Sequence, residues 1–256
     1  MKYNNVKIYV CCHKDYNDVG IDNPCYELIT KNDIKNNSKL NIIKIDKSLD
    51  DRMWSELSAI YYIWKHPELY ADWIGFNHYR RYFDFMNVVP QQLTKPIIPE
   101  HSTLFFNNYA MYDVCHNSAD LRRVLNIVAT KYQKYYNGFM SMLDSHILYS
   151  YNMFVLPLDI FKEYCEFIFG VLGEFDKELN INNDYMSMLK HIANHREAYV
   201  ERDSYPNNTY EYQARVFGFL AERLTTAFFM SYMINFGQDA VEEHKIIITE
   251  KTYNVM

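Results

Sequence analysis

The chain has 256 residues, of which 49% are hydrophobic, so it is long enough to bury a full core and too apolar to be disordered throughout. Its formal net charge of −6 excludes a broad electrostatic footprint for duplex nucleic acid, so any anion site must be local. Its 5 cysteines form no C-x-x-C pair, and this odd number argues against a disulfide framework and favours a reducing compartment.

The first strand-like segment lies near the start of the chain. Val6–Cys12 is β-branched and apolar, and it predicts a buried strand that ends at His13 and Lys14. Ligands of open α/β sheets collect at the carboxyl ends of strands. His13 is therefore a candidate hydrogen-bond partner of a nucleotide and Lys14 a candidate charge for its phosphate. Simple solvent exposure of both side chains is the alternative.

The next segments change from loop to strand to helix. Residues 15–40 are polar and predict a long loop with little regular structure, whereas residues 41–46 predict a second strand. Ser48-Leu49-Asp50-Asp51 has the form of a capping box, and apolar residues follow it in helical register. The sequence therefore predicts one helix over residues 49–65.

The rest of the chain adds more helix than strand. Residues 174–208 are polar and of low complexity, and they predict an insertion or an excursion on the acceptor side. The periodicity predicts strands at 73–76, 95–98, 151–156 and 245–249, and helices at 118–135, 157–172 and 212–233. This alternation predicts an α/β fold with a mainly parallel sheet and a helical C-terminal half.

The densest polar cluster, His78-Tyr79-Arg80-Arg81-Tyr82, directly follows an apolar strand. In an extended chain His78 and Arg80 would share one face and Tyr79 and Arg81 the other, so only one Arg would point into a given pocket. A turn would let both guanidinium groups converge, and the fork of an Arg side chain suits the oxygens of a diphosphate. An edge strand with surface ion pairs is the alternative.

The last long helix carries a second polar face. When its apolar residues form a buried stripe, Arg215, Glu222 and Thr226 fall together on another side. Glu222 is then a candidate general base or a partner of Arg215, and a solvated Glu–Arg face is the alternative. Glu56 would be similarly placed if it faced inward, but an ion pair with Arg52, four residues before it, is the simpler interpretation.

Motifs for metals and common cofactors are missing from the sequence. It has no Asp-x-Asp triplet after a strand, no H-E-x-x-H and no His/Cys zinc spacing. It also has no P-loop and no G-x-G-x-x-G. We therefore expect no metal site and no cofactor of the ATP or dinucleotide type.

Several segments, taken together and in order, resemble a known family. They are residues 56–65 (ELSAIYYIWK), 73–83 (WIGFNHYRRYF), 151–155 (YNMFV) and 215–224 (RVFGFLAERL), with His13-Lys14 after the first strand. The sequence is similar to a bacterial glycosyltransferase-like family that was long catalogued as a domain of unknown function in capsule and exopolysaccharide gene clusters. The string His-Tyr-Arg-Arg-Tyr-Phe is the most specific part of this resemblance.

The resemblance implies a single GT-A-like, Rossmann-like domain over residues 1–256. Residues 1–115 would form its nucleotide-sugar-binding half, and residues 116–256 its mostly helical acceptor side. The donor would be a nucleotide-diphosphate sugar, with Arg and Lys in place of the usual metal. The residues that the resemblance implies for donor binding are His13, Lys14, His78, Tyr79, Asn152, Arg215 and Arg223.

The chemistry of the leaving group sets the requirements of the site. Charge builds on the phosphate oxygens as the sugar departs, so the site must supply fixed positive charge there and a base for the acceptor hydroxyl. Arg80, Arg81 and Lys14 are the predicted charge suppliers. Glu222 and Asp120 are the predicted base candidates.

The predicted function is sugar transfer to a capsular, lipopolysaccharide or exopolysaccharide acceptor, either free or lipid-linked. A non-catalytic sugar-binding or assembly protein is one alternative, and a transferase of a phosphate-containing sugar decoration is another. No stretch has the length of a signal peptide or a membrane span. We therefore expect a cytoplasmic protein that meets a lipid-linked acceptor at the inner face of the membrane.

Overall fold

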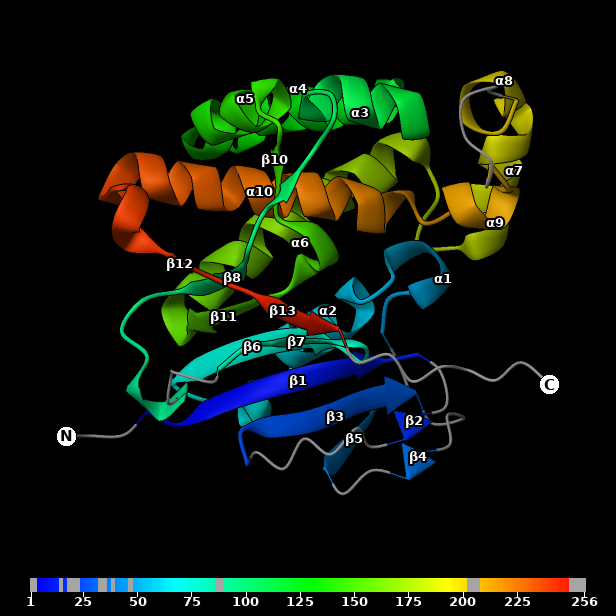
Figure 1. Ribbon diagram of the computed structural model, residues 1–256. Helices are drawn as coiled ribbons and strands as arrows, with labels where there is room; N and C mark the ends of the chain where they lie inside the picture. The colour runs from blue at the N-terminus through cyan, green and yellow to red at the C-terminus, as the bar shows by residue number, and fades with distance from the viewer. Residues whose placement is uncertain are drawn as a thin grey trace.

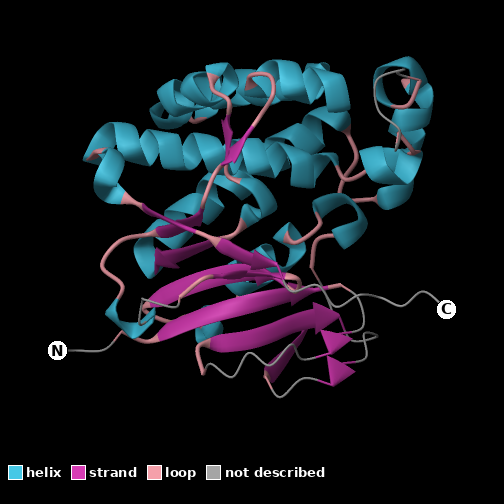
Figure 2. Ribbon diagram, in the orientation of Figure 1, coloured by secondary structure: helices cyan, strands magenta, loops and turns pink. Residues whose placement is uncertain are grey.

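The structure is a computed structural model that describes residues 4–13, 16–17, 24–31, 36–37, 40–45, 48–85, 90–201 and 208–248. In this part of the chain, nine strands join in one central sheet, in which β7 and β13 pair beside the main order β12-β8-β11-β6-β1-β3-β5. Most of the helices gather above the strands (Figures 1 and 2). The strands of this sheet are β1 (Val6–Cys12), β3 (Tyr26–Lys31), β5 (Asn41–Ile45), β6 (Trp73–His78), β7 (Arg81–Phe83), β8 (Ile97–Pro99), β11 (Phe154–Pro157), β12 (Glu242–His244) and β13 (Ile246–Ile248).

The middle of the sheet is parallel. β1 lies between β6 and β3 and runs parallel to both, and β3 pairs in parallel with β5. Nearly every residue of β1 is buried, as expected for a parallel strand covered on both faces. β11 is antiparallel to both β6 and β8. The predicted α/β fold with a mostly parallel central sheet is thus confirmed.

The expected long loop over residues 15–40 is wrong in its described part, because β3 pairs with β1 along its length. Leu28 and Ile29 are almost fully buried, so their burial outweighs the polar composition of the segment. The acidic side chain of Glu27 is accommodated by an ion pair with Lys7 of β1, at 3.5 Å. The remaining short strands, β2 (Tyr16–Asn17) with β4 (Asn36–Asn37) and β9 (Ser102–Thr103) with β10 (Ile147–Leu148), form two small sheets.

The helices are concentrated in the second half of the chain, as predicted. The α-helices are α1 (Asp51–Trp54), α2 (Leu57–Lys65), α3 (Asn108–Cys115), α4 (Ser118–Lys131), α5 (Tyr136–Asp144), α6 (Leu158–Leu179), α7 (Tyr185–Asn194), α8 (Arg196–Tyr199), α9 (Tyr210–Gln213) and α10 (Val216–Phe236). Short 3-10 helices are η1 (Pro67–Leu69), η2 (Pro90–Gln92), η3 (Gln133–Tyr135), η4 (Ser150–Asn152) and η5 (Gln238–Ala240). α10 crosses the molecule between the α3–α5 layer and the sheet (Figure 1).

α10 is the central helix of the core. Apolar residues occur all round it, and most of its length is buried. It contacts α1, α5, α6 and η4, so it joins the upper helical layer to the elements above the sheet. The strands β11, β12 and β13 also come from residues after 115, so both predicted halves build the sheet. The division into a donor half and an acceptor half stays a prediction.

The predicted single helix over residues 49–65 is two helices. Ser55 has φ 51° and ψ −134°, which ends α1, and α2 begins at Leu57. Asp50 caps α1 in place of Ser48, because its side chain accepts a hydrogen bond from the Arg52 N–H. Backbone in this left-handed region costs about 1–3 kcal/mol, and it persists only where surrounding contacts hold it.

The polar tract 174–208 is largely helical in its described part. α6 continues to Leu179 and ends at Asn180, which adopts the left-handed conformation common at helix ends. α7 and α8 follow it. Among the described residues, no helix is both long enough and apolar enough to cross a membrane.

The contact between α5 and α10 gives a prediction for Gly138. A Cβ at this position would lie 2.5 Å from the Ala227 carbonyl oxygen and 2.6 Å from the Ser231 backbone nitrogen. We expect Gly138→Ala to destabilise the fold by about 1–3 kcal/mol, because backbone cannot move aside as a side chain can. Urea denaturation measures this change.

Gly173 of α6 is the matched control, because a Cβ there would meet nothing within 4 Å. Gly173→Ala is expected to be neutral or to stabilise by up to about 1 kcal/mol through its higher helix propensity. If both variants moved the denaturation midpoint equally, the close packing of α5 on α10 would be refuted.

Candidate active site

The candidate active site lies at the carboxyl ends of β1 and β6. The parallel register pairs Cys11 with His78, and the Tyr79 N–H donates to the Cys11 carbonyl at 3.1 Å. The His13 ring centroid lies 5.7 Å from that of His78 and 5.1 Å from that of Tyr79. The structure thus brings together three predicted site residues, whereas Lys14 lies outside the described residues.

Tyr79 and Arg80 form a turn, and His78 pairs with Arg81 across the β6–β7 hairpin. The cluster therefore adopts the turn rather than the extended alternative. Arg81 is half-buried, and its guanidinium carbon lies 4.0 Å from the ring centroid of Tyr151. Arg80 is exposed and lies 5.1 Å from the Tyr79 ring centroid. The turn thus gives the two Arg side chains different surroundings.

His78 is held in its neutral form. Burial, followed by the charges of Arg81, His13, Arg80 and Arg215, lowers its pKa from 6.5 to about 3. Its Nδ1 lies 3.3 Å from the Arg80 backbone N–H and 3.4 Å from Arg81 Nη1, and it accepts from these donors. The proton of the neutral ring is then carried by Nε2, so His78 offers a hydrogen-bond donor without a charge.

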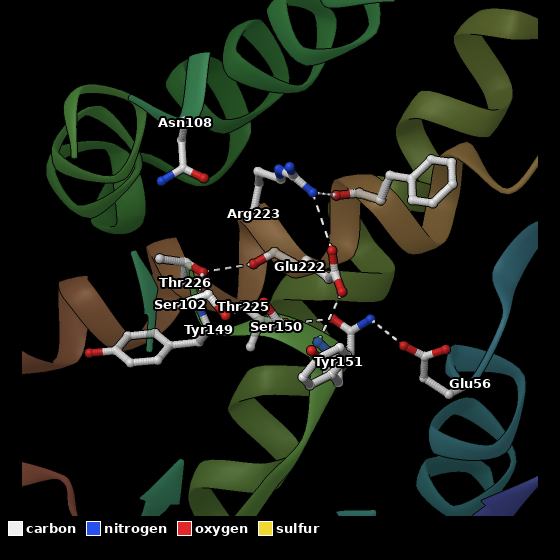
Figure 3. Close-up of polar contacts among 12 residues, drawn as sticks. Glu56, Ser102, Asn108, Tyr149, Ser150, Tyr151, Glu222, Arg223, Thr225 and Thr226 are labelled. Carbon is white, nitrogen blue, oxygen red and sulfur yellow. Dashed lines mark hydrogen bonds and ion pairs between the residues drawn. The ribbon is translucent and has the colours of Figure 1, made fainter. Parts of the chain in front are cut away.

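Glu222 of α10 is fixed through both of its oxygens (Figure 3). Oε1 accepts from the Tyr151 N–H at 2.9 Å, and Oε2 accepts from Arg223 Nη1 at 3.2 Å. Arg223 is only 5% exposed and also donates to the Phe219 carbonyl at 3.2 Å. The ion-pair partner of Glu222 is therefore Arg223 and not Arg215.

Glu56 faces inward, toward η4 (Figure 3). Its Oε1 accepts from Asn152 Nδ2 at 2.8 Å, and Asn152 Oδ1 accepts from the Thr225 hydroxyl at 3.1 Å. The chain of hydrogen bonds continues to the Tyr164 hydroxyl, 2.9 Å from that of Thr225. The expected pairing of Glu56 with Arg52 is wrong, because Arg52 pairs with Asp50.

Burial is the main cause that raises the pKa of Glu56, and the charge of Glu222 raises it further. The hydrogen bond from Asn152 and the positive charge of Arg215 act in the opposite direction and lower it. The two carboxylates are therefore close enough to repel one another. Such a pair is typical of sites that bind a proton or a cationic centre.

Backbone strain is concentrated between these two carboxylates. Tyr151 has φ 74° and Asn152 has φ 50°, both in the left-handed region. Asn tolerates this region, but a bulky Tyr rarely adopts it. The hydrogen bonds to Glu222, Glu56 and Thr225 hold the turn in place. Strain of this kind clusters at functional sites, where it orients groups in advance.

Arg215 links the cationic and anionic parts of the site. It is the residue before α10, and its Nε donates to the Ser55 hydroxyl at 3.2 Å. Its charge lowers the pKa of both His78 and Glu56, so it lies near each. The unusual backbone of Ser55 thus positions an arginine from the other half of the chain.

Asp120 belongs to a different cluster. It is fully buried, and it accepts from the Tyr199 hydroxyl at 2.7 Å and from Arg123 Nη1 at 3.1 Å. Burial is the main cause that raises its pKa to about 6. Among the described residues, its side-chain hydrogen bonds go only to α4 and α8, so the structure does not bring Asp120 to Glu222.

Sequence reasoning missed Tyr151 and assigned Glu56 to a surface ion pair. No local residue signals the turn at Tyr151, because this position is not a Gly. Asp50 could have indicated that Glu56 faces inward, because Asp50 also lies within reach of Arg52 and takes it as its partner. In the part of the chain that the structure describes, no group of three or more His, Cys, Asp or Glu side chains is placed to hold a metal ion.

Comparison with known proteins identifies the family. A family model described as a domain of unknown function, DUF4422, matches residues 7–195. The chain belongs to the DUF4422 family. The matched residues include Glu56, the turn from Tyr79 to Arg81 (the cationic turn) and the left-handed turn at Tyr151 and Asn152 (the strained turn). α10 with Glu222 lies beyond them.

The fold is shared with a solved enzyme. The apo structure of WbbM, a bifunctional glycosyltransferase, superposes on this DUF4422 chain with a TM-score of 0.70 and 20% sequence identity. The match covers 96% of this chain and 45% of the WbbM chain, so the present chain spans less than half the length of that structure. No curated protein sequence matches the chain. At this identity the likeness establishes the fold alone.

Proposed function

We propose that the chain transfers a sugar from a nucleotide-diphosphate donor to a saccharide or lipid-linked saccharide acceptor. The main support is that Arg80, Arg81 and Arg215 act together on a neutral His78 at the carboxyl ends of two parallel strands. Ligands of α/β sheets bind at this edge. The glycosyltransferase fold of WbbM favours the same reaction class.

The cations suit a departing diphosphate. Fixed guanidinium groups stabilise negative charge as it develops, and they cost no reorganisation during the reaction. The Nε of Arg81 is buried without an acceptor among the described residues, so this guanidinium still has donor capacity. Lys14 remains part of the proposal as a further charge.

The base for the acceptor hydroxyl is proposed to come from the carboxylates beside these cations, Glu222 and its neighbour Glu56. Asp120, the other predicted candidate, is bonded through both oxygens and fully buried, which favours a structural role. His13, Tyr79 and Asn152 would line or support the donor site, and Arg223 would hold Glu222. Capsular, lipopolysaccharide and exopolysaccharide chains remain the proposed acceptors, met in the cytoplasm at the inner face of the membrane.

Donor binding gives the direct test. We expect uridine or guanosine diphosphate, or one of their sugars, to raise the melting temperature, because a ligand bound only by the native state stabilises it by about 2.7 kcal/mol at 100 times its Kd. The shift is expected to persist in a chelator, since arginines replace the metal. A thermal-shift panel of nucleotide sugars, with and without chelator and manganese, measures both effects.

Four outcomes would count against this proposal in different ways. A full panel without any shift would refute a nucleotide-sugar site, and a shift that needs manganese would refute metal independence. A donor that binds but is neither hydrolysed nor transferred would favour a sugar-binding or assembly protein. Transfer of a phosphate-containing group would identify the second alternative, because the donor would differ.

A further inference from the structure

We propose that Glu56 is the catalytic base that takes the proton of the acceptor hydroxyl, with Glu222 as its positioning neighbour. This inference rests on the transfer reaction proposed above and names the base of that reaction. The two carboxylates share one site but differ in what occupies their oxygens.

No hydrogen bond from another described residue reaches Oε2 of Glu56, whereas both oxygens of Glu222 are occupied by other residues. The carboxylate of Glu56 accepts from Asn152 at Oε1 and from its own backbone N–H. In Glu222, the Tyr151 N–H occupies one oxygen and the nearly buried Arg223 the other. A proton on Glu222 would have to displace one of these donors, whereas Oε2 of Glu56 receives a proton without displacing another described residue.

The backbone around Glu56 presents its carboxylate to the site. Glu56 stands at the start of α2, but its side chain does not cap that helix. It turns instead to Asn152, whose left-handed backbone and second hydrogen bond to Thr225 fix the amide. Asn152 therefore acts as a positioning residue that holds one oxygen of Glu56 and leaves the other to face the site.

Charged and titratable groups act on Glu56 from several elements. Glu222 comes from α10, Arg215 is the residue before α10, Cys11 comes from β1 and Tyr164 from α6. The carboxylate of Glu222 favours protonation of Glu56, while Arg215 opposes it. Burial raises the pKa of Glu56 above the usual 4.5, which moves it toward the range of an effective base at neutral pH.

The proposed sugar transfer forms one bond at the anomeric carbon and breaks one. The acceptor oxygen forms a bond to the anomeric carbon of the donor sugar, and the bond from that carbon to the diphosphate oxygen breaks. The electron pair of the broken bond leaves with the nucleoside diphosphate, whose new charge faces Arg81 and Arg215. The proton of the acceptor hydroxyl passes to Oε2 of Glu56, which later releases it to water.

The first arm of the test compares two Glu→Gln variants with the donor identified by the thermal-shift panel. We expect Glu56→Gln to lower kcat by about 10²- to 10⁴-fold, the usual contribution of a general base, with the KM for the donor little changed. The Gln retains an oxygen for Asn152. Glu68→Gln, in η1 just after α2 and exposed, is the matched control and should keep the parent rate.

The second arm measures how kcat depends on pH. A purely structural role of Glu56 would leave this dependence unchanged. Because the base must be unprotonated, kcat should fall as the pH drops through the pKa of Glu56. Asn152→Ala removes a hydrogen bond that lowers this pKa, so the acidic limb should shift to higher pH. Glu222→Gln removes a charge that raises it, so the limb should shift to lower pH. The two shifts are therefore opposite in sign.

The outcomes distinguish a wrong assignment of the base from a wrong assignment of the reaction. If the parent protein transfers sugar and Glu56→Gln is as active as Glu68→Gln, the assignment of Glu56 is overturned and the transfer reaction stands. If the acidic limbs of Asn152→Ala and Glu222→Gln both stay at the parent position, the assignment is also overturned. This holds even where Glu56→Gln fails to fold. If the parent protein transfers sugar from no donor, the proposed function fails and the base with it.

Discussion

Replacing Arg81 by alanine is expected to lower sugar transfer by roughly 10²- to 10³-fold, the usual loss for one preorganised charge donor at a developing anion. Arg81 is half-buried, stacks on Tyr151 and donates toward His78, so its guanidinium is held in one place. Arg80 is exposed beside Tyr79 on the outer side of the turn. Arg80→Ala should therefore cost about tenfold or less, and kcat/KM of the two variants measures the difference.

The two arginines are controls for one another, because they differ by one position and carry the same charge. Thermal denaturation should show that both variants fold. Equal large losses would mean that the ligand draws both guanidinium groups onto the diphosphate. Parent rates in both variants would make the cationic turn a structural element, and the donor would then have to bind elsewhere.

Replacing Glu222 by alanine is expected to destabilise the fold by about 3 kcal/mol, near the lower end of the cost of breaking a buried ion pair. Arg223 would remain buried with its charge unpaired, and the Tyr151 N–H would lose its acceptor. The Glu222 side chain is itself 21% exposed, which is why we expect the lower end. Urea denaturation gives the free energy of unfolding.

A double-mutant cycle identifies the cause of this loss. Arg223→Met removes the buried charge, so Glu222→Ala should cost clearly less in the Arg223→Met background than in the parent. Glu222→Gln should also cost less than Glu222→Ala, because it keeps an acceptor for Tyr151. Strict additivity of the two substitutions would refute the ion pair as the source of stability.

The elements that sequence predicted best are those with a strong apolar pattern. β1 and β6 are buried on both faces, and α10 appears as a long helix near its predicted place. β3 was missed because Glu27 interrupts its apolar run and Lys31 ends it, and an ion pair with Lys7 accommodates Glu27. The break at Ser55 was missed because its positive φ is imposed by tertiary contacts and not by a glycine.

The candidate site was predictable as a set of residues but not as an arrangement. The motif around His78 fixed the place of the cations, yet spacing left the extended and turned forms open. Glu222 and Asn152 were chosen from separate segments, and nothing local indicates that Tyr151 joins them. Asp120 and Glu222 both lie on predicted helices, so only the fold could show that Asp120 bonds to Tyr199 instead.

The contacts of the strained turn also bear on the order in which the chain folds. The hydrogen bond from Asn152 to Glu56 closes 96 residues of chain, that from Tyr151 to Glu222 closes 71, and that from Arg215 to Ser55 closes 160. Closing loops of this length costs chain entropy, which must be lost before the contacts that offset it are formed. During synthesis, β1, β6 and the cationic turn emerge well before α10, so an incomplete chain lacks the partners that hold its left-handed residues. Competence to bind and react should consequently arise late and all at once, when α10 docks.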